Sequence, residues 1–169
     1  MLLMKRLFVA TLAAFVLIMA SSEAKDMVDT NCLACLCEAS TNCNASATCE
    51  TPVPDNHLCG AFRISRPYWI DAGKPIIKND SKTREGAFEV CVNDLYCAAD
   101  TVRKYMINFV EGKMGGNVNP DCNDDGVIDC RDFAFMHRIG GFTCQDPTVV
   151  DSEFFKRFMT CWDVVTQAS

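Results

Sequence analysis

Residues 32–59, CLACLCEASTNCNASATCETPVPDNHLC, contain six of the 12 cysteines of this 169-residue chain. An even number of cysteines in an exported chain predicts a framework of six disulfides. Zinc is the alternative, because Cys32-x-x-Cys35 also has a metal-site spacing, but export argues against thiolate ligands. We therefore expect a stapled, loop-rich first third, with pairing of all the cysteines: Cys32, Cys35, Cys37, Cys43, Cys49, Cys59, Cys91, Cys97, Cys122, Cys130, Cys144 and Cys161.

Residues 1–24 have the features of a secretory signal peptide. Lys5 and Arg6 precede an apolar run of 14 residues, and Ser22-Glu23-Ala24 suits a signal peptidase. The run is too short for a membrane span, which needs about 20 residues. We expect residues 1–24 to be removed and residues 25–169 to form one domain, secreted to the extracellular space and without membrane attachment.

The charge of the chain excludes several classes of function. The formal net charge is −6 and no basic cluster occurs, which is unfavourable for binding nucleic acid. No glycine-rich phosphate loop is present either, so nucleotide chemistry is not expected. Extracellular sugars, proteins and cell surfaces remain as ligands.

Hydrophobic periodicity predicts both helices and a strand. Apolar residues recur at steps of three and four over residues 98–110, as in an amphipathic helix. The same spacing predicts a shorter helix over residues 88–95 and another over 154–165, whose aromatic stripe we assign to the core. Residues 59–65 alternate apolar and polar side chains, which predicts a strand. The expected fold is a small, disulfide-rich α+β domain with several helices and one short β-sheet.

Several spaced motifs continue the cysteine pattern along the chain. They are Cys32-Leu-Ala-Cys35-Leu-Cys37, Cys59-Gly-x-Phe-x-Ile, Tyr68-Trp69-Ile70-Asp71-x-Gly73 and His137-Arg-Ile-Gly140-Gly141. Together they resemble the invertebrate-type lysozymes, the destabilase family, over essentially the whole mature chain. The run Asp121-Cys122-Asn123-Asp124-Asp125-Gly126 is most similar to the insect branch. The resemblance implies a lysozyme-like α+β fold and hydrolysis of the β-1,4 bond between N-acetylmuramic acid and N-acetylglucosamine in peptidoglycan.

The resemblance also places the two catalytic carboxylates, and neither is present at its position. Ser40 stands where active members have the acid Glu, and Pro52 where they have the second carboxylate. A serine hydroxyl is too weak an acid to protonate a glycosidic oxygen at useful rates. Asp55, Glu50 and Glu38 are nearby stand-ins, although Glu38 would point away from a cleft if its segment is helical. We expect weak or absent muramidase activity.

The same family suggests two further kinds of site. His137 matches the family histidine and is a candidate base for isopeptide hydrolysis, but no serine occupies the family nucleophile position before Cys59. Hydrogen bonding of His137 to the backbone is the alternative. Tyr68, Trp69 and His137 are candidates for glycan binding, and a buried Tyr–Trp pair is the alternative for the first two.

An acidic loop has the spacing of a calcium site. Oxygen-bearing side chains stand at loop positions 1, 3, 5, 9 and 12, with Gly126 at position 6. The alternative is an acidic turn tethered by disulfides, in which Asp129 caps a helix. No cofactor is required by the predicted chemistry, and structural calcium is the candidate ion for Asp121, Asn123, Asp125, Asp129 and Asp132.

These residues support two functional hypotheses. The first is a secreted lysozyme-family glycosidase of antibacterial defence or digestion, weakened or inactivated at Ser40 and Pro52. The second is a non-catalytic protein that binds peptidoglycan or a related glycan, or modulates immunity; isopeptide hydrolysis is less favoured. We expect a monomer with two candidate N-glycosylation sites, Asn44 and Asn79.

Overall fold

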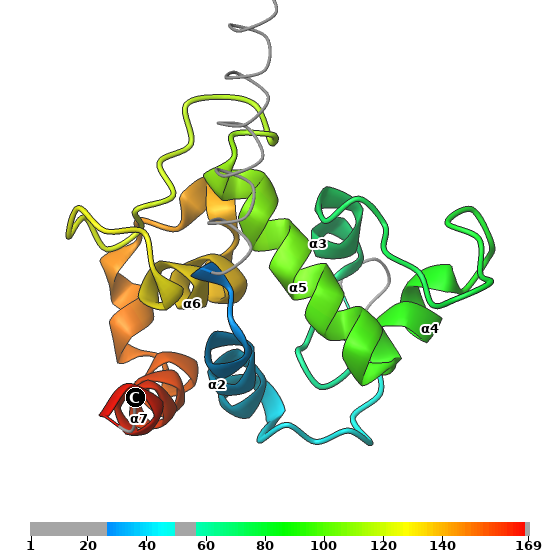
Figure 1. The fold of residues 1–169 in the computed structure, drawn as a ribbon, viewed down its shortest axis with the longest axis horizontal. Coiled ribbons are helices and arrows are strands. Elements are labelled where there is room, and N and C mark those ends of the chain that lie inside the picture. The colour runs from blue at the N-terminus through cyan, green and yellow to red at the C-terminus, as the bar shows by residue number, and fades with distance from the viewer. Residues whose placement is uncertain (1–26, 50–56, 168–169) are drawn as a thin grey trace, which may run out of the picture.

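The computed structural model describes residues 27–49 and 57–167, and these residues are mostly helical (Figure 1). The signal-peptide prediction, Glu50, Pro52 and Asp55 lie outside them. Within the described part no helix is long and apolar enough to cross a membrane. The helices are α2 (Thr30–Thr41), α3 (Arg66–Asp71), α4 (Ala87–Asn93), α5 (Leu95–Val110), α6 (Cys130–Ile139), the 3₁₀ turns η1 (Gly141–Thr143) and η2 (Pro147–Asp151), and α7 (Glu153–Gln167).

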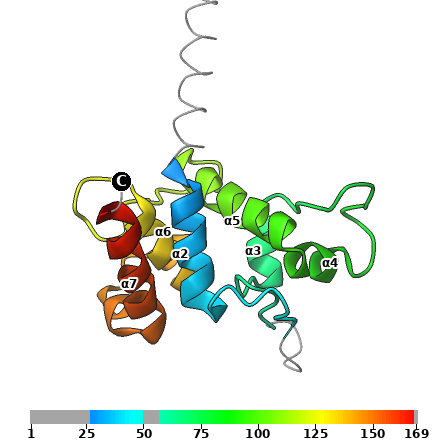
Figure 2. The same ribbon diagram turned by 60° about the horizontal axis from the view of Figure 1, so that its bottom comes forward.

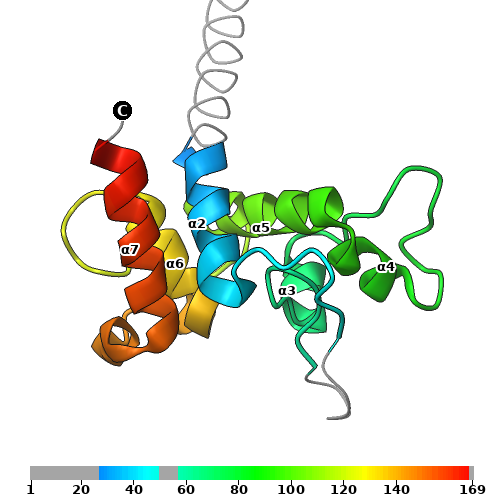
Figure 3. The same ribbon diagram turned by 90° about the horizontal axis from the view of Figure 1, so that it is seen from below.

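The helices form two groups that meet along α5. Helices α2, α6 and α7 pack together on one side, and α3 and α4 pack on the other side of α5 (Figures 1 and 2). Figure 3 shows α2 and α7 side by side, the most extensive contact between two helices. The predicted helices over 88–95, 98–110 and 154–165 are confirmed as α4, α5 and α7. Their apolar faces supply the fully buried Phe88, Phe109 and Phe158.

The ends of α2 and α6 are fixed by local chemistry and place two candidate residues. Helix α2 ends because Asn42 adopts a left-handed conformation (φ 55°), so Ser40 lies in its last turn. Helix α6 starts with a capping box between Asp129 and Asp132, and its last turn carries His137. Local hydrogen bonds and backbone conformation therefore set where α2 ends and where α6 begins.

The strand predicted over residues 59–65 is wrong, and with it the α+β class. The described residues contain no strand, only an isolated antiparallel bridge between Cys59 and Ile64. Gly60 (φ 71°) and Arg63 (φ 54°) turn the chain back within four residues, so the alternation of side chains belongs to a tight turn. A Cβ on Gly60 would lie 1.8 Å from the carbonyl oxygen of Val92, so only glycine fits there.

Six disulfides join all 12 cysteines, which confirms the predicted number. Two of them connect distant parts of the chain: Cys32–Cys130 joins α2 to the start of α6, and Cys35–Cys161 joins α2 to α7. The other four are local and join Cys37–Cys43, Cys49–Cys59, Cys91–Cys97 and Cys122–Cys144. These two long-range disulfides hold α2, which carries Ser40, to α7 and to α6, which carries His137.

Candidate functional site

Ser40 and His137, 97 residues apart in the chain, meet where α2 and α6 end. The Ser40 Oγ donates to the Leu36 carbonyl oxygen at 2.7 Å and lies 3.3 Å from the His137 Nε2. The turn at residues 60–63 completes the junction, because its Phe62 carbonyl oxygen lies 2.8 Å from the same Nε2. The Thr41 hydroxyl donates to the Ala61 carbonyl oxygen at 2.6 Å, which holds this turn against α2.

The hydrogen bonds of His137 determine its tautomer. A carbonyl oxygen can only accept, so Nε2 carries the proton and donates to Phe62. Burial lowers the pKa of His137 to about 4, and Arg138 adds to this effect, so the ring is neutral at pH 7. Its Nδ1 is then unprotonated and accepts from the Tyr68 hydroxyl at 3.2 Å. The ring links three segments as a neutral hydrogen-bonding group.

This tautomer prevents His137 from acting as a base toward Ser40. The nitrogen that faces the hydroxyl already carries a proton, and the hydroxyl donates its own proton to Leu36. A nucleophile–base pair requires the unprotonated nitrogen to accept from the nucleophile. As it stands, the geometry is that of a structural junction, which agrees with the backbone-bonded alternative for His137.

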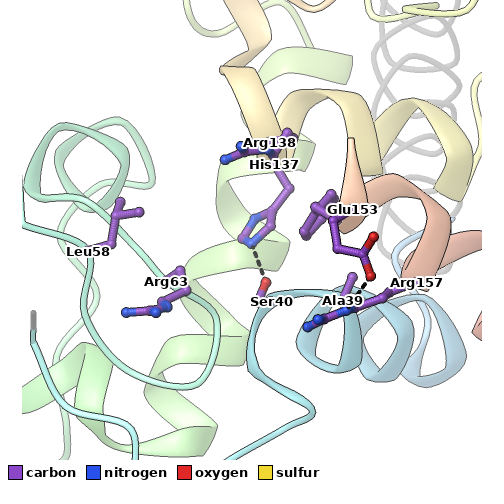
Figure 4. Close-up of a pocket in the computed structure, with 9 residues that line it drawn as sticks. Ala39, Ser40, Leu58, Arg63, His137, Arg138, Glu153 and Arg157 are labelled. Carbon is purple, nitrogen blue, oxygen red and sulfur yellow. Dashed lines mark hydrogen bonds and ion pairs between the residues drawn. The ribbon is translucent and has the colours of Figure 1, made fainter. Parts of the chain in front are cut away.

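The junction opens into a hollow that we call the central groove. Its inner pocket of about 310 Å³ adjoins an outer pocket of about 580 Å³, and both are lined by Ser40, Arg63 and Arg157. Figure 4 shows Ser40 and His137 between Arg63 on one side and Arg157 on the other. The inner pocket is completed by Ala39, Leu58, Arg138, Glu153 and Phe154. The arginines come from three elements: the 60–63 turn, α6 and α7.

Comparison with known proteins shows the family of this chain. A match to the destabilase family covers residues 29–161. The chain belongs to the destabilase family. It is 36% identical to an invertebrate-type lysozyme of Ruditapes philippinarum over 72% of this chain and 74% of that protein, and 29% identical to a lysozyme of Magallana gigas over 73% and 74%. These relatives are molluscan, and the insect-like branch stays a prediction.

Solved structures of the same family share the fold. Meretrix lusoria lysozyme, in its complex with Aeromonas hydrophila PliI, matches with a TM-score of 0.59 and 25% identity. The match covers 79% of this chain and 90% of that one. The described part of this destabilase-family protein is thus a lysozyme-like domain built mainly of helices.

The other residues predicted for the site fall into three places. Tyr68 and Trp69 are buried: Tyr68 stacks on Tyr105 with ring centroids 3.6 Å apart, and the Trp69 Nε1 donates to the Pro75 carbonyl oxygen at 2.7 Å. This is the arrangement of a core pair. Glu38 is exposed and lines a separate depression between α2 and α7. Asp55, Glu50 and Pro52 lie outside the described residues.

The glycine pair after His137 also has a physical role in this destabilase-family fold. A Cβ on Gly141 would lie 2.6 Å from the Phe109 ring, so this position needs glycine. The Gly141 N–H donates to the Tyr105 hydroxyl at 3.0 Å. Because Tyr105 stacks on Tyr68, which donates to His137, the pair of glycines belongs to the support of the junction.

The acidic loop is organised by hydrogen bonds to its own backbone. The buried Asp132 carboxylate accepts from the N–H groups of Cys122, Asn123 and Asp129. Asp121 accepts from Asp125 and Gly126, Asn123 also accepts from Asp125, and Asp125 accepts from Val127. Asp129 caps α6, as in the stated alternative, and both Asp129 and Asp125 pair with Arg131. These carboxylates form no common ligand cluster among the described residues, and calcium stays a prediction.

Four charged residues line the groove although no sequence pattern predicted them there: Arg63, Arg138, Glu153 and Arg157. One local signal was available, since Glu153 and Arg157 stand four residues apart and form an ion pair at 3.2 Å. Such a pair normally indicates only a solvated helix face. The two sequon asparagines, Asn44 and Asn79, are exposed, and Asn44 lines the outer pocket.

Proposed function

We propose that this protein is an exported, monomeric member of the destabilase family that binds peptidoglycan in the central groove and hydrolyses it weakly or not at all. Its relatives are named lysozymes, which supports the class of ligand. Antibacterial defence or digestion is the setting that we propose for it.

The observation that carries the proposal is the chemistry at Ser40. Glycoside hydrolysis requires a carboxylic acid at the scissile oxygen and a second carboxylate across the bond. By the family resemblance Ser40 stands at the position of the acid; its hydroxyl donates a hydrogen bond to the Leu36 carbonyl oxygen and lies beside His137. Among the described lining residues of the groove, Glu153 is the only carboxylate, and its side chain is 73% exposed and paired with Arg157. A general acid needs the opposite setting, an apolar pocket.

Isopeptide hydrolysis is less supported than binding. It needs an unprotonated nitrogen facing a nucleophile, whereas the His137 Nε2 donates to Phe62. Residual hydrolysis by a displaced carboxylate such as Asp55 is therefore the catalytic alternative to test.

Two assays on the mature protein test the proposal: sedimentation with insoluble peptidoglycan and clearing of a peptidoglycan suspension. We expect the wild type to sediment without clearing. The Ser40→Glu, Pro52→Asp double variant should clear at least about 100-fold faster, because general acid catalysis contributes roughly 10²–10⁴-fold. Gln167→Glu adds a carboxylate at an exposed position outside the groove and should change nothing.

Two outcomes would contradict the proposal. Clearing by the wild type that Asp55→Asn abolishes would show a muramidase with a displaced carboxylate. Absence of both sedimentation and clearing would leave the immunity-modulating alternative.

A further inference from the structure

The charge of the central groove is opposite to that of the whole chain. The chain has a formal net charge of −6, yet the described lining of the two pockets contains three arginines and one carboxylate, Glu153. Burial keeps His137 neutral at pH 7 and Ser40 is uncharged, so the one negative charge of the described lining is that of Glu153, which stands beside Arg157 in Figure 4. The described lining therefore favours an anion.

Arg138 and Arg157 are the residues best placed to meet such a ligand. Both are exposed and both line the inner pocket, one from α6 and one from α7. No ion pair of the described residues involves Arg138, and the partner of Arg157 is the largely exposed Glu153. An exposed pair of this kind contributes little and exchanges readily for a ligand carboxylate.

The guanidinium group specifies the kind of anion. Its planar fork of N–H donors matches a carboxylate with two parallel hydrogen bonds. Two forks from separate helices suit a ligand that presents more than one carboxylate along a chain. A neutral polymer of N-acetylglucosamine offers none.

We infer that the central groove recognises the carboxylate groups of its ligand through Arg138 and Arg157, so that the protein selects peptide-substituted, acidic peptidoglycan over neutral glycans. This inference rests on the proposed function, because it names the groups by which the same groove holds the wall polymer. Recognition then depends on charge and not on cleavage of the glycan.

The experiment compares two forms of one ligand. Insoluble peptidoglycan freed of teichoic acid is used as such, and a second portion has its carboxylates converted to amides with a carbodiimide and ammonia. Wild-type mature protein should bind the amidated form at least roughly tenfold more weakly, since a hydrogen bond to a charged group contributes on the order of one decade in affinity or more. Binding to the native form should also weaken as salt is added.

Variants assign the effect to the groove. Arg138→Gln with Arg157→Gln should reduce binding to native peptidoglycan to the level of the amidated form. Lys156→Gln removes one positive charge from an exposed neighbour on α7 that does not line the groove, and it should bind as the wild type. The melting temperature of each variant shows whether it is folded, and the amidated ligand tests the inference on wild-type protein alone.

The outcomes separate the two proposals. Equal binding of the wild type to native and amidated peptidoglycan overturns this inference and leaves wall binding intact. A difference between ligands that the double variant retains overturns the role of Arg138 and Arg157. Binding to neither form overturns the proposed function itself. Added teichoic acid that competes as well as soluble peptidoglycan fragments would show that phosphate is the recognised anion, and would overturn selection by carboxylate.

Discussion

The central groove and the acidic loop are both rich in polar side chains, but they use them differently. In the loop, every carboxylate of the predicted calcium set accepts a hydrogen bond from the backbone within about ten residues. In the groove, side chains from α2, α6, α7 and the 60–63 turn converge on a shared hollow. Polar groups satisfied by their own backbone shape a fold, whereas groups from distant elements that face a common space can meet a ligand.

The largest expected effect tests the structural side of this comparison. Asp132→Ala removes the acceptor of three backbone N–H groups in a buried site, so the free energy of unfolding should fall by roughly 3–5 kcal/mol. Urea denaturation measures this loss, while peptidoglycan binding of the folded protein should remain. Asp124→Asn, an exposed change in the same loop, should alter stability by less than about 0.5 kcal/mol. An unchanged free energy of unfolding in Asp132→Ala would show that the loop does not depend on these hydrogen bonds.

The next effect concerns pH and the groove. His137 has a folded pKa of about 4 against 6.5 in the unfolded chain, so the unfolded state binds the proton first as the pH falls. The free energy of unfolding should decrease by up to about 3 kcal/mol between pH 6.5 and pH 4, and His137→Gln should lack this component. Burial raises the pKa of Asp132, so its titration acts in the opposite direction: its contribution is lost as the pH rises through its folded pKa. Identical pH profiles for wild type and His137→Gln would contradict the assigned neutral ring.

A smaller effect isolates one hydrogen bond of the junction. Tyr68→Phe keeps the stack on Tyr105 but removes the donor to the His137 Nδ1, and should lower the free energy of unfolding by about 1 kcal/mol. Tyr96→Phe is the matched control, because the Tyr96 side chain is 87% exposed. It should change stability by less than about 0.5 kcal/mol. Equal decreases in the free energy of unfolding in both variants would show that the hydrogen bond from Tyr68 to His137 does not stabilise the fold.

The smallest effect is expected from calcium. The loop spacing predicts stabilisation by the ion, whereas the alternative for this loop, an acidic turn held by its own hydrogen bonds, predicts none. A metal that binds only the folded state would raise the melting temperature. We expect the same melting temperature in calcium and in EDTA. A melting temperature that is higher in calcium than in EDTA, with no such difference in Asp121→Asn, would show that the loop binds the ion. That result would contradict the comparison between loop and groove.

Helices α4, α5 and α7 and the number of disulfides could be predicted from the sequence, because periodicity and cysteine counts are properties of the chain itself. The prediction for residues 59–65 was wrong, since a tight turn at Gly60 and a strand can show the same alternation. The resemblance drew attention to Ser40 and His137 separately, but their contact depends on how α2 and α6 end against the turn. Arg138 and Arg157 gave no signal, because surface charges on helices are common and only packing showed which hollow they line.

The two long-range disulfides also determine what happens when the chain is cut. Residues 111–120 form a mostly exposed loop that contains Lys113, a setting in which proteases commonly cleave. Cleavage after Lys113 would place Ser40 on one fragment and His137 on the other. Cys32–Cys130 and Cys35–Cys161 would still join the fragments, so both walls of the groove remain attached to each other. A nicked molecule would migrate as two pieces only after reduction of these disulfides.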